Sequence, residues 1–524
     1  MNDSPDSTEA AKGRAAEFGL AFLAVVPDEA IDPALVRDIP VEWARTHCLL
    51  PVRWEGGLCL LTADPAAVDK HQDVALLTGG DLRPVVAPRE AIAKAIERCY
   101  YNRRESTEDF LRDLDAREGG TTATARSDDL LTKADEAPVT QLVNLILLEA
   151  VKSRASDIHF EPFQSRLRVR YRVDGVLYEQ AGPPKHLERA LVSRIKVMAH
   201  LDISEKRLPQ DGMARVRVGE REIDVRVSTV PVAEGERVVL RLLNRDSSIM
   251  TPDELGMPAA MQALFETLCR EANGLIIVCG PTGSGKTTTL YAAIRRLDTK
   301  GRNILTIEDP IEYQLPDIGQ MQVKPKIGLT FARSLRHMLR QDPDVILVGE
   351  TRDNETAEIA VRASLTGHLV FTTLHTNDAA GAVVRMMDMG VEPYLLAAAL
   401  RGVLAQRLVR RLCPVCRKPV AASGRELSLL GPAGKRLEGQ THYEPVGCPA
   451  CLGGYRGRAG IFELLVTDRA IEDLIRGGAS AARDIRTLVS SANRRTMLDD
   501  GVDKVVSGET SLAEVMYALG ISGV

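Results

Sequence analysis

The stretch from Leu275 to Thr289, LIIVCGPTGSGKTTT, has the clearest chemical signature in the chain. It is an apolar run that breaks into glycines, ends at a lysine and fits the pattern G-x-x-x-x-G-K-[ST] of a loop that binds nucleotide phosphates. Glycines let backbone N–H groups curl around phosphate oxygens, the lysine reaches the β- and γ-phosphates, and the next hydroxyl reaches Mg²⁺. A predicted strand before the motif and helical spacing after it argue against a chance glycine-rich turn. The expected nucleotide-binding residues are Gly280, Pro281, Thr282, Gly283, Ser284, Gly285, Lys286, which is also catalytic, and Thr287, which is also a magnesium ligand.

Three further polar side chains follow short apolar runs that we predict to be strands of the same sheet. Open parallel sheets bind ligands at the carboxyl ends of their strands, which places Glu308 to hold an attacking water and Glu350 to orient Mg²⁺. The two glutamates can exchange these roles, and helix capping or surface ion pairing is the alternative for both. His375 is a third candidate, although a histidine at a strand end can equally be a satisfied core group.

Four cysteines form two CxxC pairs, separated by a segment poor in apolar residues. Two close thiolate pairs are typical of a tetrahedral Zn²⁺ site that holds together a segment with little core of its own. A redox CxxC is the main alternative, but it does not explain two pairs. Because four thiolates leave no open coordination position, we expect a structural rather than a catalytic zinc. The predicted ligands are Cys413, Cys416, Cys448 and Cys451.

The charge and apolar patterning exclude several functional classes. The chain has 67 basic and 72 acidic residues, so no global field draws it to nucleic acid or anionic lipid. No segment reaches the roughly 18 consecutive apolar residues of a membrane span, and the N-terminus lacks the pattern of a signal peptide. The remaining five cysteines are scattered among apolar neighbours, which suits buried thiols in a reducing compartment. We therefore expect a cytoplasmic protein.

The elements that position these residues divide the 524-residue chain into several modules. The predicted fold class is α/β, because strands and helices alternate around the phosphate loop. Within it, we predict that Tyr394–Leu412 is a helix whose polar positions are arginines. The expected parts are a first module (1–101, its first 18 or so residues disordered), a charged flexible linker (102–138), a second module of sheet and helices (139–250), the nucleotide-binding core (251–395), a zinc-binding subdomain (396–466) and a C-terminal helical region (467–524).

Alternating arginines mark one strand of the second module. Arg166, Arg168, Arg170 and Arg172 occupy every second position before an Asp174-Gly175 hairpin turn. A nucleic-acid stripe is one interpretation. We favour a solvated sheet face that also contacts a neighbouring subunit, and we expect no nucleic-acid partner.

Together these motifs resemble the type II secretion ATPases, the general secretion pathway protein E family, within the larger superfamily that includes type IV pilus motors. The resemblance covers nearly the whole chain. Besides the phosphate loop, it rests on Ser156-Asp-Ile-His-Phe-Glu-Pro162, Arg207-Leu-Pro-Gln-Asp-Gly212, Asp224-Val-Arg-Val-Ser-Thr229, Gly235-Glu-Arg-Val-Val239, the acidic box Ile304 to Pro316, Arg340-Gln-Asp-Pro-Asp-Val-Ile-Leu-Val-Gly-Glu350 and the histidine box Ala363 to His375.

The resemblance implies a RecA-like ATPase core, a PAS-like second module, a hexameric ring and a first module that docks onto an inner-membrane protein of the secretion platform. It implies that Glu308 activates water, that Glu350 assists Mg²⁺, and that His368 and His375 sense the nucleotide state. It also assigns Arg226 and Arg241 of the second module to the γ-phosphate, and Arg336 and Arg340 to a further arginine cluster. One position departs from the family pattern, since Met213 stands where an arginine is expected.

The resulting prediction is an ATP hydrolase, recruited peripherally to the cytoplasmic face of the inner membrane, that drives pseudopilus assembly and protein export, with anionic lipid as a stimulant. A type IV pilus assembly ATPase is the nearest alternative, although the compact first module favours secretion. A hexameric nucleic-acid translocase and a nucleotide-gated scaffold with little turnover are the alternatives from other classes. The translocase needs a basic channel that the balanced charge does not indicate. Intact Lys286, Glu308 and Glu350 argue against the scaffold.

Overall fold

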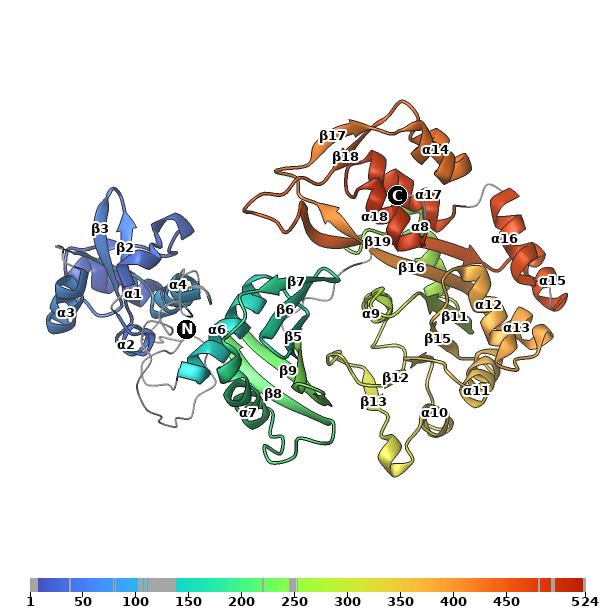
Figure 1. The fold of residues 1–524 in the computed structure, drawn as a ribbon, viewed down its shortest axis with the longest axis horizontal. Helices are drawn as coiled ribbons and strands as arrows, with labels where there is room; N and C mark the ends of the chain where they lie inside the picture. Colours follow the sequence, from blue (N-terminus) through green and yellow to red (C-terminus); the bar gives the residue numbers. More distant parts are fainter. Residues whose placement is uncertain are drawn as a thin grey trace. The chain divides into compact units, whose positions relative to one another are not determined.

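The computed structural model describes the chain except for residues 1–7, 37–38, Gly79, Asp81, 102–106, 108–110, 112–137, 219–220, 245–250, Pro252, 479–480, 492–494 and 522–524. The chain divides into two compact units, Met1–Ser247 and Ser248–Val524, and each is described by itself (Figure 1). Among the described residues, none of the helices combines the length and the apolar character that crossing a membrane requires.

The first module is a small four-stranded sheet with helices, in the strand order β1-β4-β3-β2. Its elements are α1 (Thr8–Glu17), β1 (Ala21–Phe22), α2 (Val41–His47), β2 (Leu49–Trp54), β3 (Gly57–Thr62), α3 (Val68–Thr78), β4 (Arg83–Val86) and α4 (Arg89–Tyr101). Residues 8–17 form a helix with Ala11 and Ala15 buried, so the expectation of disorder up to about residue 18 is wrong there. Two small alanines on one face were enough to pack this otherwise polar helix.

The predicted linker lies mostly outside the described residues. Between 102 and 137 the structure describes only Thr107 and Leu111, and both are buried. The backbone N–H and the hydroxyl of Thr107 donate to the Glu149 carboxylate at 2.7 and 2.6 Å. Thr107 is therefore bound to the second module through Glu149 in α6.

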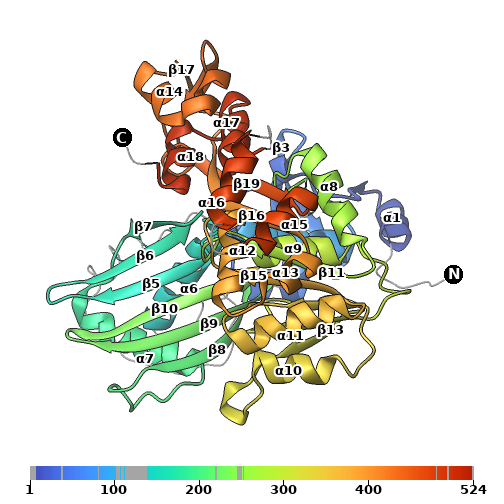
Figure 2. The same cartoon turned by 90° about the vertical axis from the view of Figure 1, so that its right-hand side faces the viewer.

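The second module is an antiparallel six-stranded sheet in the order β7-β6-β5-β10-β9-β8, which can be followed in Figure 2. The apolar positions of β6 face α6, whose Ile146 carbonyl accepts a hydrogen bond from the buried Tyr171 hydroxyl at 2.9 Å. The predicted hairpin is confirmed, since Asp174 and Gly175 have φ of 49° and 87° between β6 and β7. The elements are α6 (Pro138–Lys152), β5 (Asp157–Pro162), β6 (Leu167–Val173), β7 (Val176–Gln180), α7 (Glu188–Met198), β8 (Gln210–Val218), β9 (Arg221–Val232) and β10 (Gly235–Asn244).

The second unit is built on a seven-stranded sheet in the order β13-β12-β14-β15-β11-β16-β19, parallel except for β19. Its central strands are buried on both faces, as expected for a parallel sheet covered by helices. The elements are α8 (Ala259–Cys269), β11 (Gly274–Cys279), α9 (Lys286–Ile294), β12 (Ile304–Glu308), β13 (Gly319–Gln322), α10 (Phe331–Met338), β14 (Val345–Val348), α11 (Asn354–Leu365), β15 (Leu369–Leu374), α12 (Ala379–Asp388), α13 (Pro393–Ala399), β16 (Leu400–Leu412) and β19 (Tyr455–Val466).

The prediction of one helix over Tyr394–Leu412 is wrong. Helix α13 ends at Ala399, and β16 continues the sheet from Leu400 to Leu412. The burial pattern of β16 does not alternate, because its first half is buried on both faces, so the arginines at 407, 410 and 411 lack the period of two that would have indicated a strand. Gly402 admits close neighbours here, since a Cβ on it would lie 2.7 Å from the Leu268 side chain.

The remaining elements of the second unit are short. The segment between the two CxxC pairs has a two-stranded sheet and one helix, and the predicted short helices of the C-terminal region are confirmed. The elements are β17 (Lys418–Ala421), α14 (Gly424–Leu430), β18 (Thr441–Glu444), α15 (Arg469–Arg476), α16 (Ala481–Ser491), α17 (Met497–Val506) and α18 (Leu512–Leu519). Short 3₁₀ turns occur at Asp28–Ala30, Pro33–Val36, Lys185–Leu187, Pro325–Ile327 and Gly431–Arg436.

Phe462→Ala tests the assignment of β19 to the core sheet. The Phe462 side chain is 1% exposed, so its loss is expected to lower the free energy of unfolding by about 3–5 kcal/mol. Tyr517→Ala is the matched control, because Tyr517 is 85% exposed and its loss should change stability by less than about 0.5 kcal/mol. Urea unfolding followed by circular dichroism measures both, and equal stabilities would contradict the assignment.

Candidate active site

The phosphate loop joins β11 to α9 in a backbone conformation that only glycine adopts readily. Gly280, Gly283 and Gly285 have φ of 153°, 79° and 86°. Space as well as conformation restricts the first of them, because a Cβ on Gly280 would lie 2.3 Å from the carbonyl oxygen of Gln406 in β16. The loop therefore sits against the backbone of a strand far away in sequence.

Lys286 is the first residue of α9, and its side chain lies within the loop. The ammonium donates to the carbonyl oxygens of Gly280 at 2.8 Å and Pro281 at 3.0 Å. Burial lowers the pKa of Lys286, while the negative charge of Glu350 acts in the opposite direction. A phosphate oxygen in the loop can replace these carbonyls as the acceptor, which is the role expected of this lysine.

Gln406 is a loop contact that the sequence did not reveal. Its side-chain amide is buried and donates to the Ser284 carbonyl at 2.7 Å. The residue stands in the stretch that was assigned to a helix, and no motif marks it. Its contact with the loop follows from the pairing of β16 with β11.

Glu308 ends β12 and is buried, with an exposed fraction of 3%. Thr306 donates to one carboxylate oxygen, Oε1, at 2.6 Å, and the Gln320 amide donates to the same oxygen at 3.1 Å. The Tyr291 hydroxyl donates to the other oxygen, Oε2. A buried carboxylate with these partners is neither a helix cap nor a surface ion pair, which removes both alternatives for this residue.

Glu350 follows β14 and has different surroundings. It pairs with Arg352 and with His375, whose Nε2 lies 3.1 Å from Oε1 of Glu350. Burial alone would raise the pKa of the Glu350 carboxyl, but Arg352 and His375 outweigh it, and the net pKa lies below its ordinary value. Glu350 is therefore an anion near Lys286 with its side chain 17% exposed, which suits a group that faces Mg²⁺.

The strand order brings these groups to one edge of the sheet. Strands β12, β14, β15 and β11 are parallel neighbours, so Glu308, Glu350, His375 and the phosphate loop all follow carboxyl ends on the same side. His375 contacts Glu350 directly and is not a core histidine, because its side chain is 43% exposed.

Other residues that the family pattern groups with the site lie elsewhere in this unit. His368 precedes β15 at the opposite end of the strand from His375, and its Nδ1 is 2.9 Å from the Ala363 carbonyl. Arg336 pairs with Glu355, and Arg340 donates to the Arg336 carbonyl at 2.9 Å just before the chain enters β14. His368 and Arg340 therefore precede the amino ends of β15 and β14, whereas the partner of Arg336 belongs to the first turn of α11, which follows β14.

Arg226 and Arg241 lie on one face of the six-stranded sheet in the other unit. They are directly opposite each other on β9 and β10. The Arg241 guanidinium donates to Asp157 at 2.9 Å, and Met213 of β8 lies opposite Arg226 with its side chain 52% exposed. The family pattern places an arginine at position 213, which would add a third positive charge beside Arg226 and Arg241. The methionine found there carries no charge.

The alternating arginines at 166–172 pair with carboxylates of the two strands beside β6, which are β5 and β7. Arg168 and Arg170 contact the buried Glu161 at 2.9 and 2.8 Å, and Arg172 lies 3.9 Å from Asp157. Arg166 pairs with Glu179 at 3.2 Å. Each arginine of the stripe therefore has a carboxylate partner, but the face keeps a positive balance, because Glu161 also pairs with Arg237 and Asp157 with Arg241.

The four predicted zinc ligands meet in space. Their sulfur atoms all lie within 4.8 Å of one another. Three pairs are 3.6, 3.7 and 3.9 Å apart, close to the edge of about 3.8 Å that a tetrahedron with Zn–S bonds of 2.3 Å requires. Backbone N–H groups of Gly447 and Cys448 also point at cluster sulfurs, at 3.4 and 3.3 Å. The donor set fits a closed, structural zinc site.

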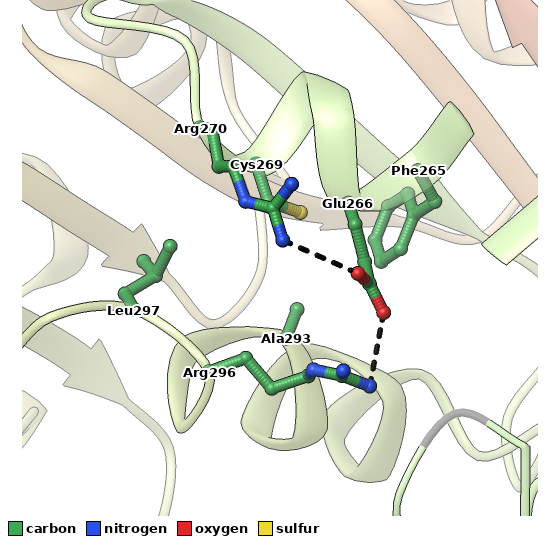
Figure 3. A pocket seen from close by; sticks show the side chains of 7 residues that line it. All are labelled: Phe265, Glu266, Cys269, Arg270, Ala293, Arg296 and Leu297. Atoms are coloured by element: carbon green, nitrogen blue, oxygen red, sulfur yellow. Dashed lines mark hydrogen bonds and ion pairs between the residues drawn. The ribbon is translucent and has the colours of Figure 1, made fainter. Parts of the chain in front are cut away.

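The other five cysteines are buried free thiols, as expected: Cys48, Cys59, Cys99, Cys269 and Cys279. One of them, Cys269, lines a cavity of about 20 Å³ between α8 and the end of α9 (Figure 3). Glu266 contacts Arg296 at 2.9 Å and Arg270 at 3.4 Å across it. The cavity is at the opposite end of α9 from the phosphate loop and has room for little more than a water molecule.

Comparisons with known proteins agree with this geometry. The family model described as "Type II/IV secretion system protein" matches residues 132–517, and an MshEN domain model matches residues 18–106. The chain is 46% identical over 508 residues to the type II secretion system protein E of Pseudomonas aeruginosa, covering 94% of this chain and 98% of that one. It is 44% identical over 492 residues to the type IV pilus assembly ATPase PilB of Myxococcus xanthus, covering 93% and 87%.

A solved structure supports the fold. The ATPase DotB of Legionella pneumophila aligns with a TM-score of 0.54 at 21% identity, over 73% of this chain and 96% of that one. At this level of identity the match concerns the fold alone. The predicted α/β class, with an ATPase core that carries smaller modules, is confirmed.

Glu308→Gln separates nucleotide binding from turnover. We expect ATP to bind with near-normal affinity, while kcat falls about 100- to 10,000-fold because the amide cannot take a proton from water. Lys286→Ala is the contrasting variant and should weaken nucleotide binding itself. Steady-state hydrolysis and equilibrium nucleotide binding measure the two effects. Near-normal turnover in Glu308→Gln would move the water-activating role to Glu350.

Cys413→Ser tests the thiolate cluster. We expect the variant to lose bound zinc and to melt at lower temperature, because metal binding contributes to folding. Cys59→Ser changes a buried thiol outside the cluster and should keep its zinc. Metal analysis and thermal melting under reducing conditions measure the zinc content and the melting temperature of each variant. Wild-type protein without zinc would contradict the assignment of the four cysteines as zinc ligands.

Proposed function

The chain belongs to the Type II/IV secretion system protein family, and from that membership we propose that it is the ATPase of a type II secretion system. It is an ATP-hydrolysing enzyme, as its family and its intact phosphate loop show. The buried Glu308 carboxylate at the same sheet edge as the loop supports hydrolysis, because this arrangement suits an attacking water, and the 46% identity to a type II secretion system protein E supports the secretion system.

The proposed division of labour follows from the chemistry of each side chain. Glu308 orients the water that attacks the γ-phosphorus and accepts its proton, and ADP leaves as the P–O bond breaks. Lys286 stabilises charge on the β- and γ-phosphates. Thr287 and Glu350 offer oxygen ligands to the metal, and Mg²⁺ when bound neutralises phosphate charge. His375 is proposed to sense the nucleotide state through its contact with Glu350.

Arg226 and Arg241 are proposed to stabilise the γ-phosphate when the second module closes over a nucleotide. Arg241 is paired with Asp157, so binding requires the guanidinium to share or exchange that partner. The zinc held by the four cysteines is proposed to be structural, because the cluster offers no open coordination position.

Hydrolysis is proposed to drive pseudopilus assembly by a ring of six copies, as the family resemblance implies. The first module, which the MshEN domain model matches, would dock onto an inner-membrane platform protein and bring the otherwise cytoplasmic chain to the membrane, with anionic lipid as a stimulant. The same proposal includes the division of the chain into modules that end at residues 101, 138, 250, 395 and 466.

Two alternatives differ in partner rather than in chemistry. A type IV pilus ATPase is supported by the match to PilB, at an identity close to that of the type II relative. A nucleic-acid translocase would need unpaired basic residues, whereas the β6 arginines are engaged with Glu161, Asp157 and Glu179.

The test is ATP hydrolysis by the full chain, alone and with added partners. We expect stimulation by the cytoplasmic domain of a type II platform protein together with anionic vesicles, and little change with neutral vesicles or with single-stranded DNA. The equivalent domain of a type IV pilus platform is the matched control. Stimulation by the pilus domain alone would favour the pilus alternative, and stimulation by DNA alone would overturn the secretion proposal.

A further inference from the structure

The carboxylate of Glu308 is bound by three donors that come from three different elements. Tyr291 belongs to α9, Thr306 to β12 itself, and Gln320 to β13. Tyr291 donates to Oε2, whereas Thr306 and Gln320 both donate to Oε1, at 2.6 and 3.1 Å. The side chains of Tyr291 and Thr306 are fully buried.

The number of donors limits where a water can bind. An ionised carboxylate has about four lone-pair positions, two on each oxygen. Both positions on Oε1 are occupied, and Tyr291 takes one on Oε2. One position on Oε2 is left for a water, and its direction is set by the hydroxyl beside it.

Sheet geometry explains why these groups converge. Successive side chains of a strand alternate between faces, so Thr306 and Glu308 share a face of β12. Gln320 is directly opposite Thr306 in the parallel pair β12/β13. Tyr291 follows Lys286 on α9, so a single helix carries both the phosphate-binding lysine and the phenol that binds the glutamate.

Gln320 also connects Glu308 to the loop between β12 and β13. Its Oε1 accepts the backbone N–H of Leu315 at 2.7 Å, and its amide donates to the Tyr313 carbonyl at 3.3 Å. The Tyr313 ring packs edge-on against Tyr291, with centroids 4.6 Å apart and planes at 88°. The same amide therefore contacts the loop and the carboxylate.

We propose that Tyr291 and Gln320 are positioning residues, which orient the Glu308 carboxylate so that the free lone pair of Oε2 points toward the attacking water. Because Gln320 also binds the loop at 309–318, the orientation of the carboxylate depends on the conformation of that loop. The proposal rests on the proposed catalytic role of Glu308. Neither residue contacts the phosphate loop directly through its polar atoms, so their loss should affect turnover and leave nucleotide affinity unchanged.

Tyr291→Phe is the first test, because it removes only the hydroxyl. A hydrogen bond to a charged group has a strength that corresponds to a roughly 10- to 100-fold fall in kcat, with KM changed less than about threefold. Tyr313→Phe is the matched control, since the Tyr313 ring touches Tyr291 but its hydroxyl does not bind Glu308, and it should keep wild-type kcat. Unchanged kcat in Tyr291→Phe overturns the proposal.

A double-mutant cycle separates positioning from general damage. In the Glu308→Gln background, Tyr291→Phe should lower single-turnover hydrolysis of radiolabelled ATP less than about twofold, because the group it positions is already gone. An undiminished effect in that background overturns the proposal. If Glu308→Gln alone keeps near-normal turnover, the proposed role of Glu308 fails. If Glu308→Gln is inactive while Tyr291→Phe is normal, only the positioning role fails.

Gln320→Leu provides a second, independent variant. Gln322 lies on the same strand with an exposed side chain, so Gln322→Leu controls for the loss of an amide from β13. We expect a fall in kcat for Gln320→Leu and none for Gln322→Leu, at melting temperatures within a few degrees of wild type. If Tyr291→Phe proves unstable, this pair decides the proposal, and equal kcat values for the two variants overturn it.

Discussion

The close approach of the phosphate loop to β16 is the constraint on which the rest of the active site depends. The Gly280 Cα sits where any side chain would collide with the Gln406 carbonyl, and the Gln406 amide binds Ser284. The loop is thus shaped by β11 on one side and by β16 on the other. Sheet pairing holds the strands on which the loop rests, whereas the Lys286 ammonium has to exchange its contacts with the Gly280 and Pro281 carbonyls for phosphate oxygens when a nucleotide binds.

The two glutamates occupy environments that suit different tasks. Glu308 is buried and bound by neutral donors, whereas Glu350 is partly exposed and lies near Lys286, Arg352 and His375. A carboxylate among cations stays ionised and can face a metal, while one in a closed neutral network can order a single water. The contrast gives a physical reason for assigning water to Glu308, which the strand-end positions alone left open.

Charge pairing and a cluster of thiols add to the apolar packing of the other modules. On the six-stranded sheet, Asp157 and Glu161 are buried and compensated by arginines of the adjacent strands. A buried carboxylate requires such partners, so the basic stripe of β6 follows from the acidic residues of β5. In the segment that holds the two CxxC pairs, four sulfurs at a spacing that fits a tetrahedral metal site lie beside a small apolar cluster that includes Leu430 and Leu437.

By itself the sequence determined what local spacing encodes: the phosphate loop, the two CxxC pairs, the Asp174-Gly175 turn, and the strand-end positions of Glu308 and Glu350. The tertiary structure alone decided which distant residues meet. Gln406 reaches the loop through strand pairing, Gln320 reaches Glu308 through the β12/β13 register, and His368 is separated from His375 by the length of β15. The helix predicted over β16 failed for the same reason, because an apolar run with irregular arginines becomes a strand only when β11 and β19 pair with it.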